Sequence, residues 1–154
     1  RKTASLLASA CAAGAYSATG DEEVMERMRA FGEKTGVAFQ IKDDLFDYGN
    51  ASVGKPTGID IREKKMTLPL IYTLSQADPK TKRHLIYIVK NHSTDKQKVA
   101  EVIDAVIRHG GIAYAEKKML EYQQQAFDIL YTFPEGEIRT GLERLVRFTT
   151  ERKY

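Results

Sequence analysis

The sequence has a single cysteine and no long apolar run. Cys11 lies in the alanine-rich segment 8–13, where a small buried side chain is the natural interpretation. An intrachain disulfide is excluded, and the low cysteine usage fits a reduced, cytoplasmic setting. No segment reaches the roughly 20 apolar residues that a membrane-spanning helix needs. The first residues include neither a methionine nor a signal-peptide pattern, so we expect the sequence to begin inside a longer protein.

Strong net charge is also lacking. The 24 basic and 21 acidic residues are interspersed and leave a net charge of +3, which is too weak to predict a nucleic-acid partner. Hydrophobic residues make up 42% and charged residues 29%, a balance typical of folded globular proteins and not of disordered chains. A chain of 154 residues is long enough for one domain.

Strand patterns are almost absent, whereas helix patterns recur along the whole chain. Thr67 and Asp78 stand where helices are expected to begin, as caps followed by proline in the first turn. The connections are short, which favours antiparallel neighbours, so the predicted fold is an all-α antiparallel bundle. The expected helices are 2–19, 21–48, 67–76, 78–91, 95–109, 112–131 and 135–152, with a glycine-rich loop at 49–59.

An acidic cluster lies near the end of the second expected helix. With Gln40 taken as zero, Asp43 lies at about −60° and Asp44 at about +40° around the helix. Asp47 lies between them at about −20°, and Gly36, one turn before Gln40, leaves space above this face. Neighbouring carboxylates repel one another unless cations lie between them. Oxygen ligands without histidine or cysteine indicate Mg²⁺ or Mn²⁺, and a solvated acidic turn is the alternative.

A basic segment follows the acidic cluster. Lys55 is held between Gly54 and Pro56, and Lys64 and Lys65 come about ten residues later. Because Mg²⁺ usually keeps phosphate oxygens among its ligands, the cluster also predicts a phosphorylated ligand. Lysines beside such a site suit a diphosphate, whereas an ordinary surface loop is the alternative interpretation.

Three motifs in the first half of the chain together resemble the trans-type polyprenyl diphosphate synthases. Gly36-Val-Ala-Phe-Gln-Ile-Lys-Asp-Asp-Leu-Phe-Asp47, preceded by Phe31-Gly32, is similar to the second aspartate-rich motif of that family. Gly54-Lys-Pro56, with Gly58, Asp60, Glu63, Lys65 and Thr67-Leu-Pro-Leu-Ile71, resembles the stretch after it. Lys2-Thr-Ala4 with Gly14 and Ala15 resembles the preceding helix. The resemblance spans about Lys2 to Leu74, and the order and spacing make it specific.

The resemblance implies an Mg²⁺-dependent prenyltransferase that condenses an allylic diphosphate with isopentenyl diphosphate and releases diphosphate. By resemblance, Asp43 and Asp44 are the metal ligands, and Asp47 binds directly or through water. Lys55 and Lys65 correspond to lysines that hold the allylic diphosphate.

Further roles come from the same resemblance. Lys2 stabilises the departing diphosphate, while Thr3 and Gln40 help to place the developing cation and the proton acceptor. Arg152 resembles a basic C-terminal residue that reaches the isopentenyl diphosphate site, and a solvated helix end is its alternative. The family usually forms homodimers, so we expect one here.

Two features of the family are missing: a first aspartate-rich motif and an upstream basic patch. We therefore expect the 154 residues to be the C-terminal portion of a single catalytic domain and to be inactive alone. Lys64 replaces a residue that is often glycine in the family. A non-catalytic subunit, a helical interaction module and a terpene cyclase are the other interpretations, and product length is not determined by these residues.

Overall fold

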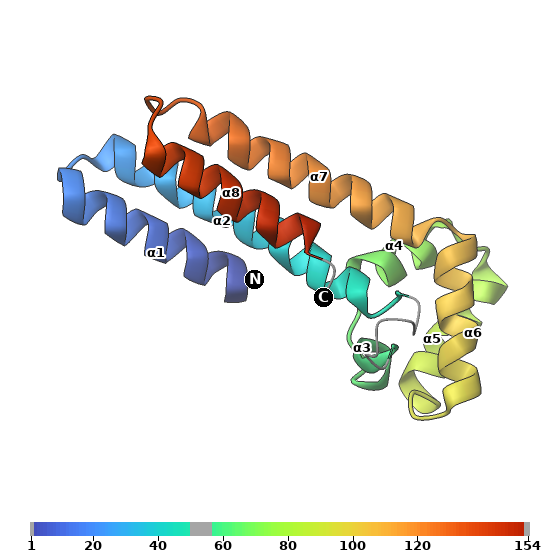
Figure 1. Ribbon diagram of the computed structural model, residues 1–154. Coiled ribbons are helices and arrows are strands. Elements are labelled where there is room, and N and C mark those ends of the chain that lie inside the picture. Colours follow the sequence, from blue (N-terminus) through green and yellow to red (C-terminus); the bar gives the residue numbers. More distant parts are fainter. Residues whose placement is uncertain (1, 50–56, 153–154) are drawn as a thin grey trace. The chain divides into compact units, whose positions relative to one another are not determined.

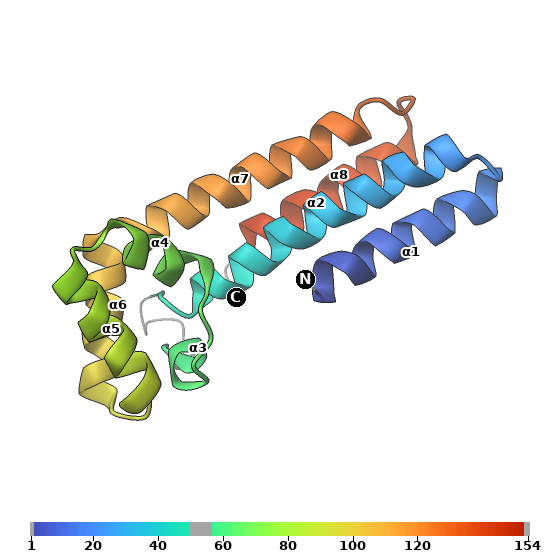
Figure 2. The ribbon, with the colours of Figure 1, turned by 180° about the vertical axis from the view of Figure 1, so that it is seen from behind.

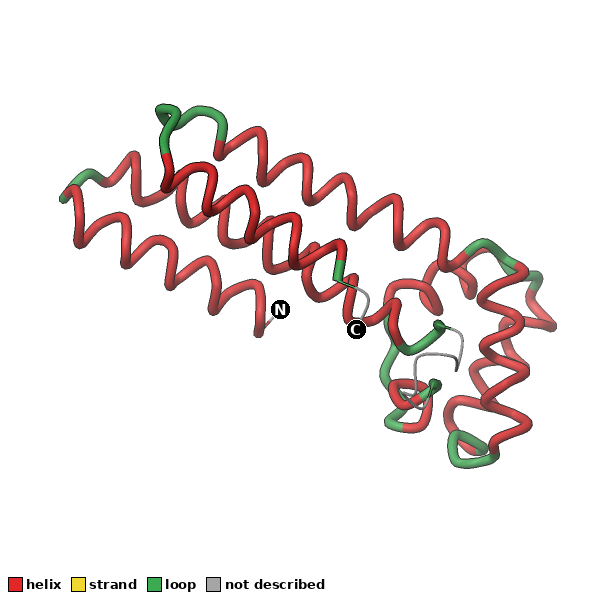
Figure 3. Tube along the Cα trace, viewed as in Figure 1, coloured by secondary structure: helices red, strands yellow, loops and turns green. Residues whose placement is uncertain are grey.

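The computed structural model describes residues 2–49 and 57–152 (Figure 1). Within these residues the chain is helical without a β-strand, as Figure 3 shows, so the predicted all-α class is confirmed. Contacts divide the described residues into two compact units, 2–42 with 118–152, and 43–49 with 57–117. The helices are α1 (Lys2–Thr19), α2 (Glu22–Phe46), α3 (Ile59–Arg62), α4 (Leu68–Gln76), α5 (Pro79–Asn91), α6 (Lys96–Arg108), α7 (Gly111–Leu130) and α8 (Glu137–Glu151).

Aspartate caps begin several of these helices. The Asp78 side chain accepts hydrogen bonds from the amides of Lys80 and Thr81 at the start of α5, and Asp95 does the same for α6. Thr67 precedes α4 but makes no capping bond. Its buried hydroxyl instead pairs with the Tyr48 hydroxyl at 2.7 Å, so Thr67 occupies the predicted N-cap position without making the side-chain capping bond.

The first unit contains α1, most of α2, the later part of α7, and α8, which run side by side in Figures 1 and 2. Its core joins α2, α7 and α8 through buried apolar side chains, namely Phe31, Ala126, Phe127, Leu130 and Val146. Burial of such side chains contributes about 1.5–3 kcal/mol each for the larger aliphatic and aromatic residues.

Glycines let α1 approach α2 closely within this unit. A Cβ added to Gly36 would lie 2.6 Å from the Cα of Ala4, and one added to Gly32 would lie 2.6 Å from the carbonyl oxygen of Leu7. Both contacts are with backbone, so the helices would have to separate. The space at Gly36 is thus occupied by α1, which corrects the expectation that this glycine leaves room above the acidic cluster.

The second unit contains α3 to α6 and the first turns of α7. Its core is mostly aliphatic and includes Ile61, Leu70, Leu85, Ile88, Val102 and Val106. Gly58, with φ 76°, lies where an added Cβ would be 2.4 Å from Cγ1 of Val99. Its backbone conformation and its packing on α6 therefore both require glycine. Across the described residues, none of the helices is at once long and apolar enough to span a membrane.

Candidate active site

Thr3 and Gln40, which were predicted as catalytic residues, meet in the first unit. The Thr3 hydroxyl donates a hydrogen bond of 3.1 Å to Oε1 of Gln40, and both residues are half-buried. The contact follows from the packing, because Gly36 brings Ala4 against α2 one turn before Gln40. Lys2 begins α1 and is exposed, so its ammonium is accessible to an anion. This hydrogen bond fixes the orientation of the Gln40 amide.

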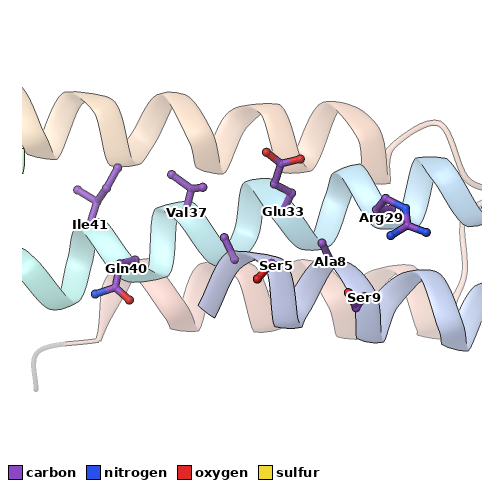
Figure 4. A pocket seen from close by; sticks show the side chains of 9 residues that line it. Ser5, Ala8, Ser9, Arg29, Glu33, Val37, Gln40 and Ile41 are labelled. Carbon is purple, nitrogen blue, oxygen red and sulfur yellow. The ribbon is translucent and has the colours of Figure 1, made fainter. Parts of the chain in front are cut away.

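An elongated pocket of about 500 Å³ lies along α1 and α2, with Gln40 in its wall (Figure 4). Small or apolar side chains make most of its lining. Arg29 and Glu33 lie nearer the beginning of α2 than Gln40 does, as Figure 4 shows. An apolar chain could therefore lie along the two helices from Gln40. The lining residues are Ala4, Ser5, Ala8, Ser9, Arg29, Glu33, Val37, Gln40 and Ile41.

Asp43 and Asp44 lie in the last turn of α2, and both are half-buried. The last turn of this helix contains no basic residue. Carboxylates at a helix C-terminus add to the negative end of the helix dipole, an unfavourable arrangement in isolation. A divalent cation there would be stabilised by the carboxylates and by the dipole together. This end of α2 therefore has the electrostatics of a cation site.

Asp47 lies outside the helix that was expected to carry it. Helix α2 ends at Phe46, two residues before the expected end at about Tyr48. Asp47 therefore lies in the following turn and does not share a helical face with Asp43 and Asp44. Its side chain is only 8% exposed. One carboxylate oxygen accepts from the amide of Ile59 at 2.7 Å, and the other from the amide of Asp60 at 3.1 Å.

Burial raises the pKa of Asp47, and the negative charge of Asp60 adds to that rise. Hydrogen bonding from backbone amides at the beginning of α3 opposes it. The backbone carbonyl of Asp47 also accepts from the amide of Gly58 at 2.9 Å. The residue therefore holds the beginning of α3 with three hydrogen bonds.

Lys65 lies just after α3 and contacts two acidic side chains. Its ammonium is 2.6 Å from a carboxylate oxygen of Glu63 and 3.1 Å from one of Asp60. These two interactions, first the hydrogen bond that Lys65 donates to Glu63, raise the pKa of Lys65. The side chain is exposed, so the ammonium remains accessible. Lys55, the other lysine predicted to hold the diphosphate, lies outside the described residues.

Arg152 folds onto α2 at the end of the described chain. Its guanidinium lies 4.1 Å from the centroid of the Phe39 ring. Phe39 directly precedes Gln40, so the contact joins the end of α8 to the part of α2 that carries the predicted catalytic amide. A cation over an aromatic ring is an attractive arrangement, which argues against a fully solvated helix end.

Among the described residues, no three histidine, cysteine, aspartate or glutamate side chains are grouped to hold a metal ion. Mg²⁺ commonly takes only one or two protein carboxylates and completes its shell with water and phosphate oxygens. A pair of carboxylates such as Asp43 and Asp44 is therefore enough protein ligand for one Mg²⁺ ion.

Some site interactions could not be found from sequence. The pairing of Lys65 with Asp60 spans five residues, whereas helical ion pairs are expected at three or four. The hydrogen bonds from Ile59 and Asp60 to Asp47 join residues 12 and 13 positions apart. Neither spacing corresponds to a regular helical contact. The weak available signal was Gly58, two residues before Asp60, because glycine is common in tight turns.

The family of the chain follows from comparison with known proteins. A family model described as polyprenyl synthetase matches residues 1–106, which is more than half of the 154 residues. The chain belongs to the polyprenyl synthetase family. The resemblance seen in the motifs of the first half of the chain is thereby confirmed.

Relatives and solved structures agree with this assignment. Over 156 residues, covering 100% of this chain and 47% of the relative, the chain is 36% identical to a short chain isoprenyl diphosphate synthase of Methanothermobacter thermautotrophicus. A geranylgeranyl pyrophosphate synthase from Bacteroides thetaiotaomicron superimposes with a TM-score of 0.89 at 36% identity, covering 97% of this chain and 50% of that one.

A third similar protein is a polyprenyl synthase from Caulobacter crescentus, whose crystal structure is complexed with calcium and isoprenyl diphosphate. It matches with a TM-score of 0.87 at 32% identity, over 99% of this chain and 47% of that one. The polyprenyl synthetase chain described here thus spans about half the length of the relatives that it matches.

Proposed function

We propose that the protein containing this chain is a polyprenyl diphosphate synthase. It joins an allylic diphosphate to isopentenyl diphosphate and releases diphosphate. The observation that carries this proposal is the pair Asp43 and Asp44 at the negative end of α2, on the helix that also carries Gln40. The Caulobacter crescentus relative, with its bound calcium and isoprenyl diphosphate, supports both a divalent cation and this class of substrate.

The residues of this chain divide the work of ionising the allylic substrate. Asp43 and Asp44 hold Mg²⁺, or Mn²⁺, which when bound neutralises charge on the departing diphosphate. Lys55 and Lys65 bind the allylic diphosphate, and Lys2 adds positive charge as that group leaves. In this scheme the side chains position and stabilise charge and form no covalent bond with the substrate.

The Thr3–Gln40 pair and the pocket beside it act on the prenyl group. The hydrogen bond holds the Gln40 amide in one orientation, so its dipole can stabilise a developing carbocation. The mostly apolar lining of the pocket suits a prenyl chain. Arg152, over Phe39, is in our proposal a contact for isopentenyl diphosphate. A homodimer is the expected assembly.

Product formation by the full-length protein tests this function. It is incubated with labelled isopentenyl diphosphate, farnesyl diphosphate and Mg²⁺, and the extracted prenyl products are sized. Asp43→Ala and Asp44→Ala should each lower the rate by two or more orders of magnitude, roughly the loss known for removing a group that stabilises transition-state charge. Asp104→Ala, an exposed aspartate of α6, is the matched control and should keep full activity.

The alternative function is a non-catalytic subunit of such a synthase. It is disfavoured because Asp43, Asp44 and Lys65 are all present, and a subunit without catalysis has no need of them. A folded full-length protein that binds Mg²⁺ and diphosphate but yields no product from geranyl, farnesyl or dimethylallyl primers would establish this alternative instead.

A further inference from the structure

Asp47 connects two parts of the second unit that are distant in sequence. Its carboxylate accepts one amide hydrogen from Ile59 and one from Asp60, and its carbonyl accepts the amide of Gly58. All three donors are backbone groups at the beginning of α3, where a helix leaves its amides without partners inside the helix. Gly58 offers no side chain to cap this helix, so Asp47 supplies the cap from outside it.

The far end of the same short helix carries Lys65. The amide of Lys65 donates to the carbonyl of Asp60 at 2.8 Å, and that of Lys64 to the carbonyl of Ile61 at 3.0 Å. With Lys64 in the left-handed region, at φ 59°, this is a Schellman turn. The Lys65 ammonium returns to the Asp60 carboxylate at 3.1 Å. The Asp60 carboxylate thus contacts the Lys65 ammonium, and the backbone amide of Asp60 donates a hydrogen bond to the Asp47 carboxylate.

We propose that Asp47 is a positioning residue, which holds the beginning of α3 and thereby places the Lys65 ammonium for the diphosphate of the substrate. The diphosphate part of this inference rests on the proposed function. The capping part stands on hydrogen bonds alone and needs no cation. Asp47 therefore differs from Asp43 and Asp44, although the three share one aspartate-rich motif.

Hydrogen exchange in the full-length protein without Mg²⁺ tests the capping part. Asp47→Asn is nearly isosteric but replaces one acceptor oxygen with a donor. Loss of a hydrogen bond to a charged group should speed exchange of the Ile59 or the Asp60 amide by about tenfold or more. Asp44→Asn, which changes a carboxylate on α2, should leave both amides as they are. Unchanged exchange in Asp47→Asn would overturn the proposal.

A double-mutant cycle tests whether Asp47 acts through Lys65. Binding of inorganic diphosphate with Mg²⁺ is measured for the wild type, Asp47→Asn, Lys65→Ala and the double variant. In the protein with Lys65, Asp47→Asn should weaken diphosphate binding about fivefold or more. In the Lys65→Ala background it should weaken binding less than about twofold, because the contact of the Lys65 ammonium with diphosphate is already lost. Asp44→Asn should weaken binding by the same factor in both backgrounds.

Other outcomes separate the possible failures. Equal losses from Asp47→Asn in both backgrounds, as for Asp44→Asn, would make Asp47 an independent ligand and overturn the positioning role. A wild-type protein that does not bind diphosphate with Mg²⁺ would reject the proposed function and the diphosphate part of this inference. The exchange rates would still decide whether Asp47 holds α3.

Discussion

Gly36 shows how one missing side chain sets the spacing of two helices. A methyl group there would meet the Cα of Ala4 at 2.6 Å, and a backbone atom in a helix cannot rotate away. We expect Gly36→Ala to lower the free energy of unfolding of the full-length protein by roughly 1–3 kcal/mol, the usual range for overpacking. Chemical denaturation measures the change. Because Gln40 lies one turn away, product formation should fall as well.

A second helical glycine serves as the control, because alanine there changes helix propensity without crowding a neighbouring helix. Gly141 lies inside α8, and a Cβ added there would find no heavy atom within 4 Å. Gly141→Ala should therefore raise the free energy of unfolding by about 0.5–1 kcal/mol, since alanine costs less backbone entropy in a helix. If both substitutions proved stabilising, the close contact at Gly36 would be wrong.

Lys64 occupies a backbone conformation that favours glycine. It has φ 59° and is exposed, so little besides the turn depends on its side chain. The left-handed conformation costs a non-glycine residue roughly 1–2 kcal/mol, partly offset by the greater freedom of glycine in the unfolded chain. Lys64→Gly should therefore stabilise the protein by about 0.5–1 kcal/mol in thermal or chemical unfolding.

The same change at a helical position is the control. Lys82 is exposed inside α5, and Lys82→Gly should destabilise by roughly 0.5–1 kcal/mol because glycine is a poor helix former. If Lys64→Gly destabilised the protein as much as Lys82→Gly, the backbone strain inferred at Lys64 would be wrong. Glycine, which the resemblance led us to expect at Lys64, is the residue that this turn prefers.

Sequence patterns predicted local contacts well and distant ones poorly. The cap Asp78 was recognisable because a cap acts on amides two or three residues later. Thr67 matched the same pattern, but its hydroxyl hydrogen-bonds the Tyr48 hydroxyl, 19 residues away in sequence, and no amide of α4. Asp47 was assigned by helical periodicity to a face it does not share, since the helix ends one residue earlier.

Helix α5 begins with a cap that titrates. Hydrogen bonds from the side chain and amide of Thr81 and from the amide of Lys80 lower the pKa of Asp78 below its usual value near 4. A folded-state pKa below the unfolded one gives stability that is present above about pH 4 and is lost as the pH falls through the folded value. We therefore expect the melting temperature to decline below about pH 4 partly through Asp78.

Asp78→Asn isolates this contribution. Asparagine caps a helix about as well as aspartate but does not titrate, so helix α5 should keep its beginning. The difference in melting temperature between wild type and variant should be greatest near neutral pH and shrink in acid. Glu101 and Glu143, whose pKa values are also lowered by hydrogen bonds, are common to both proteins and cancel in this difference. A difference that is constant with pH would exclude a titrating cap.

Among the elements, the long helices were predictable and α3 was not. Their boundaries agree with the sequence expectation to within a few residues because caps, glycines and prolines mark them. Helix α3 has four residues, too few for a hydrophobic period. Its beginning depends on Asp47 and its packing on Val99, which lie 12 residues before and 40 after Ile59. Such an element is specified by tertiary contacts.

At the level of the whole chain, the order of the motifs carried the identification. Lys2-Thr3, the second aspartate-rich motif and Gly54-Lys-Pro56 were each short, but their spacing predicted the family that the comparison with known proteins confirmed. Product length could not be predicted, since none of these motifs addresses it. Because the chain spans about half the length of its relatives, tests of catalysis need the full-length protein.

Ligand-dependent stability of that protein provides a test of the site without turnover. Asp43 and Asp44 at the negative end of α2 should bind Mg²⁺ well only when diphosphate shares it. Inorganic diphosphate and Mg²⁺ together should therefore stabilise the fold by about 2.7 kcal/mol at a hundredfold excess over the dissociation constant, and either alone by much less. Calorimetric melting measures this shift, and a chelator should reverse it.

Asp43→Asn and Asp44→Asn should remove most of the response to the ligand. Melting of each variant without ligand supplies the reference from which that response is measured. With Mg²⁺ and diphosphate, the same variants should lose most of the ligand-induced rise in melting temperature, because the cation has lost a ligand. Stabilisation by diphosphate that neither Mg²⁺ removal nor these variants diminish would mean that the lysines bind the anion by themselves. The two carboxylates would then belong to an ordinary acidic turn with no part in binding a cation.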